Sequence, residues 1–171
     1  MSLDGEIILQ LNNVESSYGP VKAIRGVSLK VHRGSIVTVL GANGAGKSTI
    51  LKTISGIIDP QKGSVVYHGQ PIQKKDPAWI VREGIAHVPE DRQRRGLVLP
   101  FAAWESAVLG YQKRPRYDRL GWLRQPVMQG DTAAMIERYD VRPRDIALKC
   151  ANFSGGNQQK LVLAREAQTE P

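Results

Sequence analysis

The sequence predicts an α/β fold, and three consecutive features predict it. Residues 35–40 form a short apolar run rich in β-branched side chains, which is typical of a buried strand. The glycine-rich stretch GANGAGKST follows at residues 41–49. Apolar residues then recur at helical spacing over residues 50–54, and Gly56 is placed to end that helix. A strand, a glycine loop and a helix in this order are the structural context of a phosphate-binding loop.

Residues 41–49 fit the Walker A pattern G-x-x-x-x-G-K-[ST], with Gly41, Gly46, Lys47 and Ser48 in the four fixed places. The glycines let the backbone approach a ligand closely, and successive N–H groups then form an anion-binding nest. The helix that begins near Gly46 adds the positive end of its dipole. The sequence therefore predicts a P-loop NTPase core. A glycine-rich turn with a stray lysine is the alternative, and both flanks disfavour it.

Two side chains of this loop carry specific chemistry. Lys47 brings a positive charge to the β- and γ-phosphates, and the Ser48 hydroxyl can ligate Mg²⁺. The expected ligands are therefore the phosphates of a nucleotide together with Mg²⁺. The nucleotide contacts expected in the loop are Gly41, Asn43, Gly44, Ala45, Gly46, Lys47, Ser48 and Thr49.

Composition and charge limit the kinds of protein that the sequence can encode. The chain has 171 residues and a formal net charge of +8, which is compatible with nucleic acid, an anionic membrane surface or a nucleotide as ligand. It contains no apolar run long enough to span a membrane and no signal-peptide pattern, so we expect a cytoplasmic protein. Cys150 is the only cysteine and is expected to be a packing residue. His32, His68 and His87 have no metal-ligand spacing.

Antiparallel strands are expected around the P-loop. Residues 6–12, 27–31 and 64–68 have strand patterns, and the predicted turn Tyr18-Gly19-Pro20 lies between the first two. They indicate an antiparallel β-subdomain beside a parallel core, so the expected sheet is mixed. The Tyr18 ring could stack on a nucleotide base or pack locally, and the residues alone favour local packing. A short helix over residues 77–83 and a buried strand over residues 85–88 follow.

The second half of the chain has helical patterns. Residues 102–111 and 126–139 are predicted helices, and the basic segment 113–124 is an expected exposed connection. The basic run 92–96 is expected to be a solvated loop. The stretch NFSGGNQQK then leads into an apolar helix, with Asn152 or Ser154 as its N-cap. This helix start could be only a cap or could face a phosphate.

The Walker A motif together with FSGGNQQ, residues 153–159, resembles the ATP-binding subunits of ABC transporters. The second motif is similar to the family signature, usually LSGGQ, with Phe153 and Asn157 as the departures. In that family two ATP-binding domains meet head to tail, and the signature of one domain contacts the nucleotide of the other. The resemblance therefore implies that the nucleotide is ATP or ADP, bound with Mg²⁺. It also implies nucleotide contacts from Ser154, Gly155, Gly156 and Asn157.

The resemblance assigns two further residues. It implies that Tyr18 stacks on adenine, which reverses the preference from the residues alone. It puts Glu90 in the Q-loop position, near Mg²⁺ and the attacking water, where glutamine is usual and glutamate is typical of some importer subfamilies. Catalytic and metal contacts implied within the chain are thus limited to Lys47, Ser48 and Glu90. The Walker B Asp, the Glu after it and a switch histidine have no counterpart after the signature helix.

The resemblance divides into two parts. Residues 1–90 are similar to branched-chain amino-acid importer ATPases, and residues 91–171 to the second ATPase half of simple-sugar or nucleoside importers. The Lys and Arg counts change from 7 and 3 through Glu90 to 3 and 11 beyond it. We therefore predict a join near residues 88–91, a chimera whose C-terminal part of the fold is missing. Without the missing strand, residues 35–40 would lose a neighbour.

The expected organisation has three parts: a P-loop core with its β-subdomain (1–100), an inserted α-helical lobe (101–153) and the signature helix (154–171). The implied function is that of an ABC importer ATPase, which couples ATP hydrolysis to transport of an amino acid, sugar or nucleoside. The implied partners are a second ATP-binding domain and membrane permease subunits at the inner face of the plasma membrane, with no nucleic acid expected. A nucleotide-binding module without turnover and a basic DNA-associated ATPase are the alternatives. The 171-residue chain alone is expected to be nearly inactive.

Overall fold

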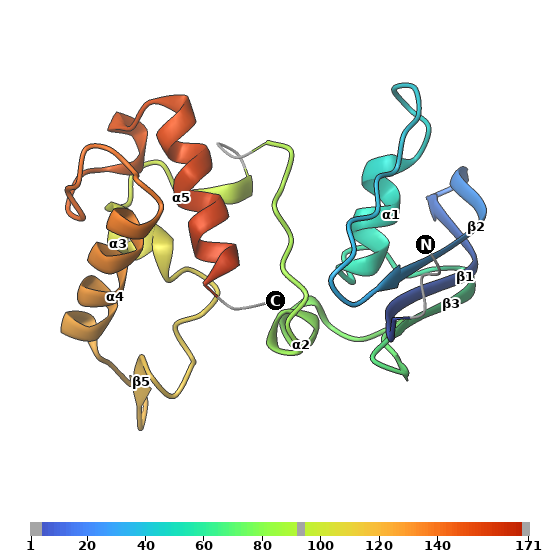
Figure 1. The fold of residues 1–171 in the computed structure, drawn as a ribbon, viewed down its shortest axis with the longest axis horizontal. Helices are drawn as coiled ribbons and strands as arrows, with labels where there is room; N and C mark the ends of the chain where they lie inside the picture. Colours follow the sequence, from blue (N-terminus) through green and yellow to red (C-terminus); the bar gives the residue numbers. More distant parts are fainter. Residues whose placement is uncertain (1–4, 92–94, 169–171) are drawn as a thin grey trace. The chain divides into compact units, whose positions relative to one another are not determined.

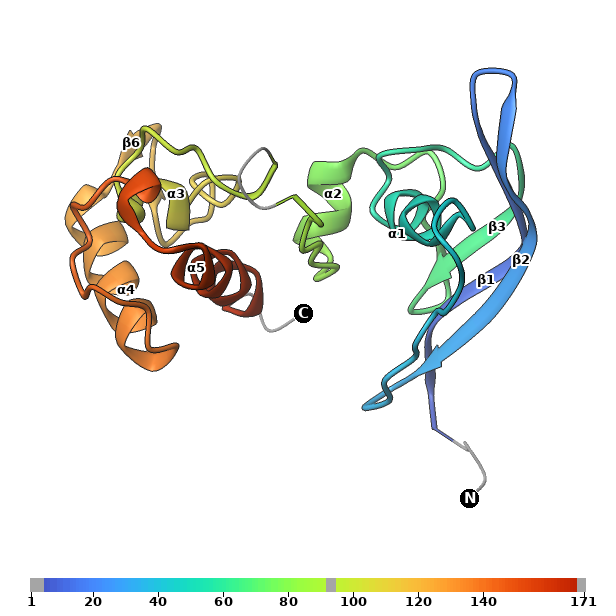
Figure 2. The same ribbon diagram turned by 90° about the horizontal axis from the view of Figure 1, so that it is seen from above.

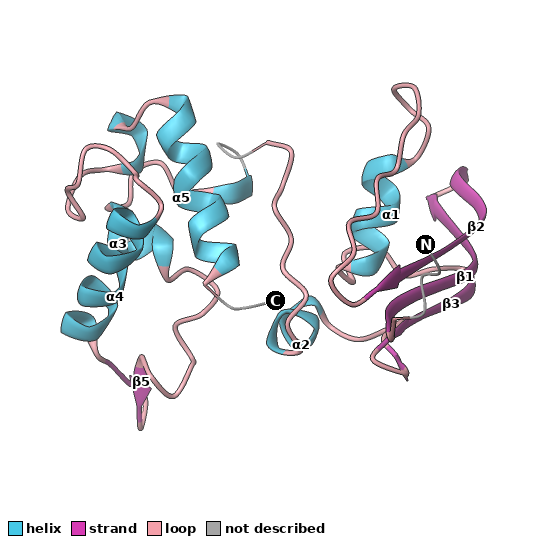
Figure 3. Cartoon of the chain, viewed as in Figure 1, coloured by secondary structure: helices cyan, strands magenta, loops and turns pink. Residues whose placement is uncertain are grey.

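The computed structural model describes residues 5–91 and 95–168, which divide into two compact units, Met1–Ile85 (unit 1) and Ala86–Pro171 (unit 2). Strands dominate unit 1 and helices dominate unit 2, as Figure 3 shows. The predicted three-part division at residues 100 and 153 stays a prediction. The predicted solvated loop 92–96 falls largely outside the described residues, because residues 92–94 are not described.

Unit 1 is built on a four-stranded antiparallel sheet in the order β2-β1-β3-β4 (Figure 1). Its strands are β1 (Ile7–Tyr18), β2 (Val21–His32), β3 (Lys62–Tyr67) and β4 (Gln70–Pro71). A tight turn at residues 19–20 joins β1 to β2, and Gly19 supplies the positive φ of 55° in that turn. The three predicted strands of the β-subdomain are thus confirmed and are longer than predicted.

The P-loop helix α1 (Lys47–Ile54) lies on one face of this sheet (Figure 2). Its Ile50 side chain belongs to the hydrophobic core that the sheet forms. The core of unit 1 contains Leu11, Val14, Ile24, Ile50, Val65 and Ile72. A buried hydrogen bond of 3.1 Å between the hydroxyls of Ser16 and Thr53 ties β1 to the helix. The predicted helix after β4 is α2 (Pro77–Arg82), which has Asp76 as its N-cap and Pro77 in its first turn.

Two strand predictions are wrong, because residues 35–40 and 85–88 have no strand in the structure. Ile36 is 95% exposed and Leu40 is 87% exposed. A strand buried in a parallel sheet needs hydrogen-bonding neighbours on both sides. The strands of the described ranges pair only antiparallel and lie elsewhere in the sequence, so neither segment is hydrogen-bonded to a neighbouring strand.

Unit 2 is a helical unit with one small hairpin. Its elements are α3 (Ala103–Ala107), β5 (Asp118–Arg119), β6 (Trp122–Leu123), α4 (Gln125–Arg138), the 3-10 helix η2 (Cys150–Asn152) and α5 (Gly155–Ala167). The predicted helix 102–111 is shorter than expected, and the predicted exposed connection 113–124 contains the β5–β6 hairpin. Within the described ranges, the helices are all too short or too polar to cross a membrane.

The core of unit 2 is formed by α3, α4 and α5. Met135 and Ile136 of α4 meet Leu161, Val162 and other buried residues of α5 in one hydrophobic cluster. Cys150 is fully buried in the same cluster, so the prediction of a packing role is confirmed. This packing fixes the start of α5, which carries the signature-like sequence.

Candidate functional site

The glycine loop of unit 1 has the backbone conformation that close approach to an anion requires. Gly44 and Gly46 have φ values of 84° and 87°, which side chains with a Cβ rarely adopt. The Ala45 N–H donates to the Ala42 carbonyl at 3.1 Å and closes a tight turn in the loop. A Cβ at Gly46 would lie 2.6 Å from Ile24 Cγ2, so β2 leaves no room for any other residue there. The shape of the loop therefore depends both on the glycines within it and on the close approach of β2.

Lys47 lies over this loop. Its ammonium group donates to the carbonyl oxygens of Gly41 at 2.7 Å and Ala42 at 2.8 Å. An ammonium group has three N–H donors, so two are used by the loop and one remains for a ligand. The loop carbonyls thus hold a full positive charge beside the glycine turn, where an anion would enter.

The helix after the loop adds its own donors. Gly46 is the N-cap of α1, and the first intrahelical bond joins the Ile50 N–H to the Gly46 carbonyl at 3.0 Å. N–H groups in the first turn of a helix have no carbonyl within the helix and favour negative charge. Thr49, Ile50 and Thr53 are buried, which holds the helix against the sheet. The loop, Lys47 and the helix start therefore fit the phosphates of a nucleotide.

The donor set also fits Mg²⁺ when a nucleotide is bound. Ser48 is half-buried and places a hydroxyl in the first turn of α1. Mg²⁺ commonly takes one or two protein ligands and completes its shell with phosphate oxygens and water. Across residues 5–91 and 95–168, no three His, Cys, Asp or Glu side chains gather into a metal-binding group. Ser48 would thus hold the ion jointly with the nucleotide phosphates.

Tyr18 lies at the end of β1 and is 46% exposed. Lys52 of α1 donates to its hydroxyl at 3.2 Å and lies 5.5 Å from the ring centroid. The ring is therefore oriented by the helix that begins with Lys47 rather than buried in the core. The sequence did not indicate this role of Lys52.

The signature-like residues of unit 2 form a compact helix start. The Ser154 side chain caps α5 by accepting the Asn157 N–H at 3.4 Å, so Ser154 rather than Asn152 is the N-cap. The Asn157 side chain donates from Nδ2 to Ser154 Oγ at 2.9 Å. The Oδ1 atom of Asn157 accepts the backbone N–H of Arg142 at 2.8 Å. Since a backbone N–H can only donate, this bond fixes which end of the amide faces Ser154.

A buried polar network in unit 2 was missed by the sequence analysis. Arg165 of α5 donates from Nε to Glu166 at 2.8 Å and from Nη1 to the carbonyls of Gly96 at 2.8 Å and Ser106 at 3.2 Å. The Tyr111 hydroxyl donates to Glu166 at 2.7 Å. Burial, together with this bond to a carboxylate, raises the pKa of Tyr111. Partners 55 to 69 residues apart leave no local sequence signal.

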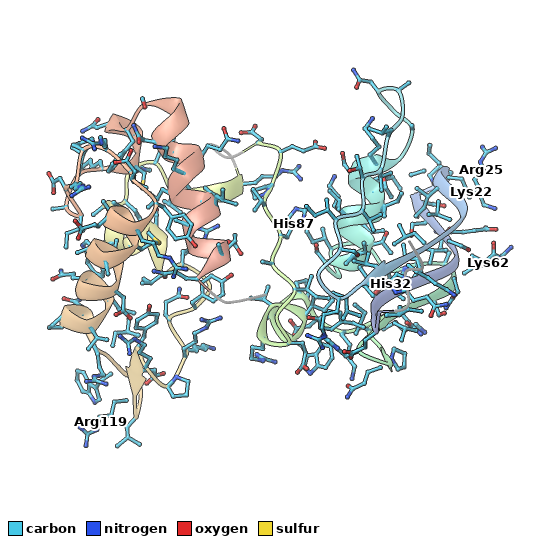
Figure 4. The ribbon with its side chains drawn as sticks, in the orientation of Figure 1. Lys22, Arg25, His32, Lys62, His87 and Arg119 are labelled. Carbon is cyan, nitrogen blue, oxygen red and sulfur yellow. The ribbon has the colours of Figure 1, made fainter. Side chains whose placement is uncertain are left out.

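The structure brings the expected contacts together in two groups. Residues 41–49 and Tyr18 belong to unit 1, and residues 154–157 belong to unit 2. Glu90 also belongs to unit 2, where it is exposed and outside any helix or strand. The histidines labelled in Figure 4, His32 and His87, lie in different units.

Comparisons with known proteins identify the family of the chain. Residues 24–171 match the ABC transporter family. The chain is 33% identical over 168 residues to the nucleoside import ATP-binding protein NupA of Lactococcus lactis subsp. cremoris (strain MG1363), covering 97% of this chain and 33% of that protein. It is 34% identical over 172 residues to the guanosine import ATP-binding protein NupO of Bacillus subtilis (strain 168), covering 100% of this chain and 32% of that protein. The chain thus spans about a third of the length of these relatives.

Solved structures have the same fold. A nucleotide-free ATP-binding cassette from an ABC transporter has a TM-score of 0.78 and 24% identity, covering 97% of this chain and 66% of that chain. The ATP-binding cassette MJ0796, a dimer in a post-hydrolysis state bound to ADP and Pi, has a TM-score of 0.78 and 23% identity, covering 96% and 71%. The predicted α/β cassette fold is confirmed. Because the family match runs from Ile24 to Pro171 and includes both the P-loop and the signature-like helix start, the chain belongs to the ABC transporter family.

Proposed function

We propose that this chain is the ATP-binding part of an ABC importer and binds ATP or ADP through residues 41–49. The observation that carries the proposal is the P-loop of unit 1, in which Lys47 lies over two loop carbonyls at the start of α1. The charge of Lys47, the loop amides and the helix dipole act on the same phosphates. Ser48 would ligate Mg²⁺, and Tyr18, oriented by Lys52, would stack on the base.

Ser154, Gly155, Gly156 and Asn157 would contact the nucleotide of a second ATP-binding domain. The hydrogen bonds at this helix start support the proposal. Ser154 Oγ accepts two bonds from Asn157, which use both of its lone pairs. The hydroxyl proton therefore remains to be donated, and an anion such as a γ-phosphate is a suitable acceptor. Asn157 would then orient Ser154 in addition to any contact of its own.

The transported solute is proposed to be small and polar. Relatives named for nucleoside, guanosine and ribose import favour a nucleoside or sugar over an amino acid. The same names favour an import ATPase over a nucleotide-binding module without turnover. The proposed partners are membrane permease subunits and a second ATP-binding domain, with the chain on the inner face of the plasma membrane. Glu90 is proposed to contact Mg²⁺ and water in the assembled site.

The P-loop proposal is tested by titrating the chain with ATP and with ADP in the presence of Mg²⁺ by isothermal calorimetry. Saturable binding of both nucleotides with one site per chain is expected. Heat indistinguishable from dilution, in a sample whose circular dichroism shows a folded protein, would contradict the proposal.

Phosphate release by a polypeptide of these 171 residues is expected to be far below the roughly 1–10³ per second of typical enzymes. Hydrolysis needs a carboxylate that orients or deprotonates water. Glu166 accepts hydrogen bonds from Tyr111 and Arg165 in a buried network, so it is not available for that role. A steady-state phosphate assay measures the rate. Ordinary turnover that disappears in Lys47→Ala would show that another residue supplies the base.

The join near residues 88–91 also stays a prediction. Single relatives align across it, since NupO covers 100% of the chain. A natural gene that encodes residues 60–130 without interruption would count decisively against it.

A further inference from the structure

The β5–β6 hairpin of unit 2 presents three exposed apolar side chains. Leu120 is 95% exposed, Trp122 is 81% exposed and Leu123 is 52% exposed. The two strands pair antiparallel, with Arg119 opposite Trp122 and Asp118 opposite Leu123. Figure 1 shows β5 extending from the helical unit, and Figure 4 labels Arg119 there. Trp122 and Leu123 are consecutive in β6 and therefore face opposite sides of the two-stranded ribbon. The tip thus exposes apolar side chains on both of its faces, which is typical of a contact surface.

The leucine at the tip of the hairpin does not favour the turn in which it lies. Leu120 and Gly121 have φ values of 56° and 87°, so both central residues of the turn are left-handed. This turn type favours Asn-Gly, because asparagine tolerates positive φ better than leucine does. Leu120 thus combines an unfavourable backbone conformation with almost complete exposure. Such a residue points to a function outside the fold.

The hairpin is also strongly basic. Its segment, residues 113–124, contains five basic side chains and one acidic one, Asp118. Asp118 is used inside the turn, where it accepts the Gly121 N–H at 2.7 Å. In the described part of the chain, Arg119 and Arg124 have no carboxylate partner, whereas Arg116 is paired with Asp131. The surface around the apolar tip is therefore positive.

The base of the hairpin is fixed to α4. The Arg116 guanidinium binds the Asp131 carboxylate through two hydrogen bonds, of which the one from Nη2 to Oδ1 measures 2.6 Å. This pairing lowers the pKa of Asp131. Tyr117 is buried, and its carbonyl accepts the Arg124 N–H at 2.8 Å. Because its base is anchored, the hairpin already holds its tip away from the helices. Little further ordering of the tip is then needed when it binds.

We propose that the β5–β6 hairpin docks on an anionic lipid surface, with Leu120, Trp122 and Leu123 at the acyl boundary and Arg119 and Arg124 among the headgroups. Tryptophan is enriched at membrane interfaces, and arginine can bury its stem while its charge stays with the headgroups. Cytoplasmic loops of membrane proteins carry excess positive charge and would repel this tip, whereas anionic lipids attract it. The inference rests on the proposed function only in placing the chain near a membrane.

Co-sedimentation with vesicles tests the hairpin. The chain is expected to bind vesicles of equal parts phosphatidylglycerol and phosphatidylcholine, to bind phosphatidylcholine alone weakly, and to dissociate as salt is raised. Tryptophan fluorescence should be quenched by brominated acyl chains, and this quenching should be lost in Trp122→Phe.

Three variants locate the contact. Arg119→Glu is expected to lower vesicle affinity about ten-fold or more, since each basic residue contributes about five-fold. Leu120→Asn is expected to lower it about ten-fold while the thermal midpoint stays equal or rises, because the turn becomes less strained. The double variant should lose binding almost completely. If Leu120 had only a structural role, its replacement would lower the thermal midpoint together with the vesicle affinity.

Two control variants in unit 1 match these changes. Arg25→Glu, whose side chain is labelled in Figure 4, and Ile36→Asn are both exposed and should bind vesicles like the wild type. Loss of binding in Ile36→Asn but not in Leu120→Asn would overturn the inference, as would equal binding to neutral vesicles. Retention of a DNA probe that Arg119→Glu abolishes, without vesicle binding, would assign the hairpin to nucleic acid instead. ATP binding by each variant is measured separately by calorimetry. Absence of vesicle binding therefore does not count against the proposed nucleotide site.

Discussion

Replacing Lys47 by alanine is expected to weaken ATP binding by about ten-fold to a hundred-fold, because charge-assisted hydrogen bonds contribute about 1.5–3 kcal/mol. The Lys47 ammonium lies over the glycine loop, held by the carbonyls of Gly41 and Ala42. It can approach a phosphate with little further ordering, so its loss removes a positioned charge. The fold should survive, since the Lys47 side chain does not belong to the hydrophobic core of unit 1.

Calorimetry with ATP and ADP measures this effect. Lys30→Ala is the matched control, because Lys30 is an exposed lysine of β2 in the same unit. Its affinity should equal that of the wild type. If Lys47→Ala and Lys30→Ala bind ATP equally well, residues 41–49 are not the nucleotide site. A larger loss for ATP than for ADP would indicate that the lysine acts mainly on the γ-phosphate.

Replacing Arg165 by methionine is expected to destabilise unit 2 by about 3–5 kcal/mol, because removing one partner of a buried ion pair leaves the other uncompensated. Arg165 and Glu166 are both almost fully buried. The change removes the charge that neutralises Glu166 and the donor to the carbonyls of Gly96 and Ser106. The Tyr111 hydroxyl would still donate to this carboxylate at 2.7 Å, but it carries no charge that could neutralise it. A loss of this size is a large part of the stability of a unit this small.

Amide hydrogen exchange in α5 measures the loss within unit 2 alone. Arg138→Met is the matched control, because Arg138 lies exposed on α4, and its effect should stay within about 0.5 kcal/mol. Adding Glu166→Gln to Arg165→Met should recover much of the loss, since no charge then stays buried. If Arg165→Met exchanges like Arg138→Met, the network does not stabilise α5.

The sequence by itself determined the features whose causes lie within a few neighbouring residues. The P-loop needs glycines at positive φ, a lysine and a helix start, and all of them lie within residues 41–49. The turn after Tyr18 is equally local, and so is the capped start of α5, although the sequence left Asn152 and Ser154 as alternative caps and the structure selects Ser154. The positions of β1, β2, β3 and α4 followed from hydrophobic periodicity for the same reason.

Only the tertiary structure decided the features that need distant partners. Residues 35–40 and 85–88 have the composition of strands but do not form them. A strand forms only where a neighbouring strand supplies hydrogen-bonding partners for its backbone, and the composition of a segment does not reveal whether such a neighbour exists. The contact between Asn157 and the Arg142 backbone spans 15 residues, and that between Tyr111 and Glu166 spans 55. Such pairings arise from packing of the whole unit, so no local pattern predicts which donor meets which acceptor.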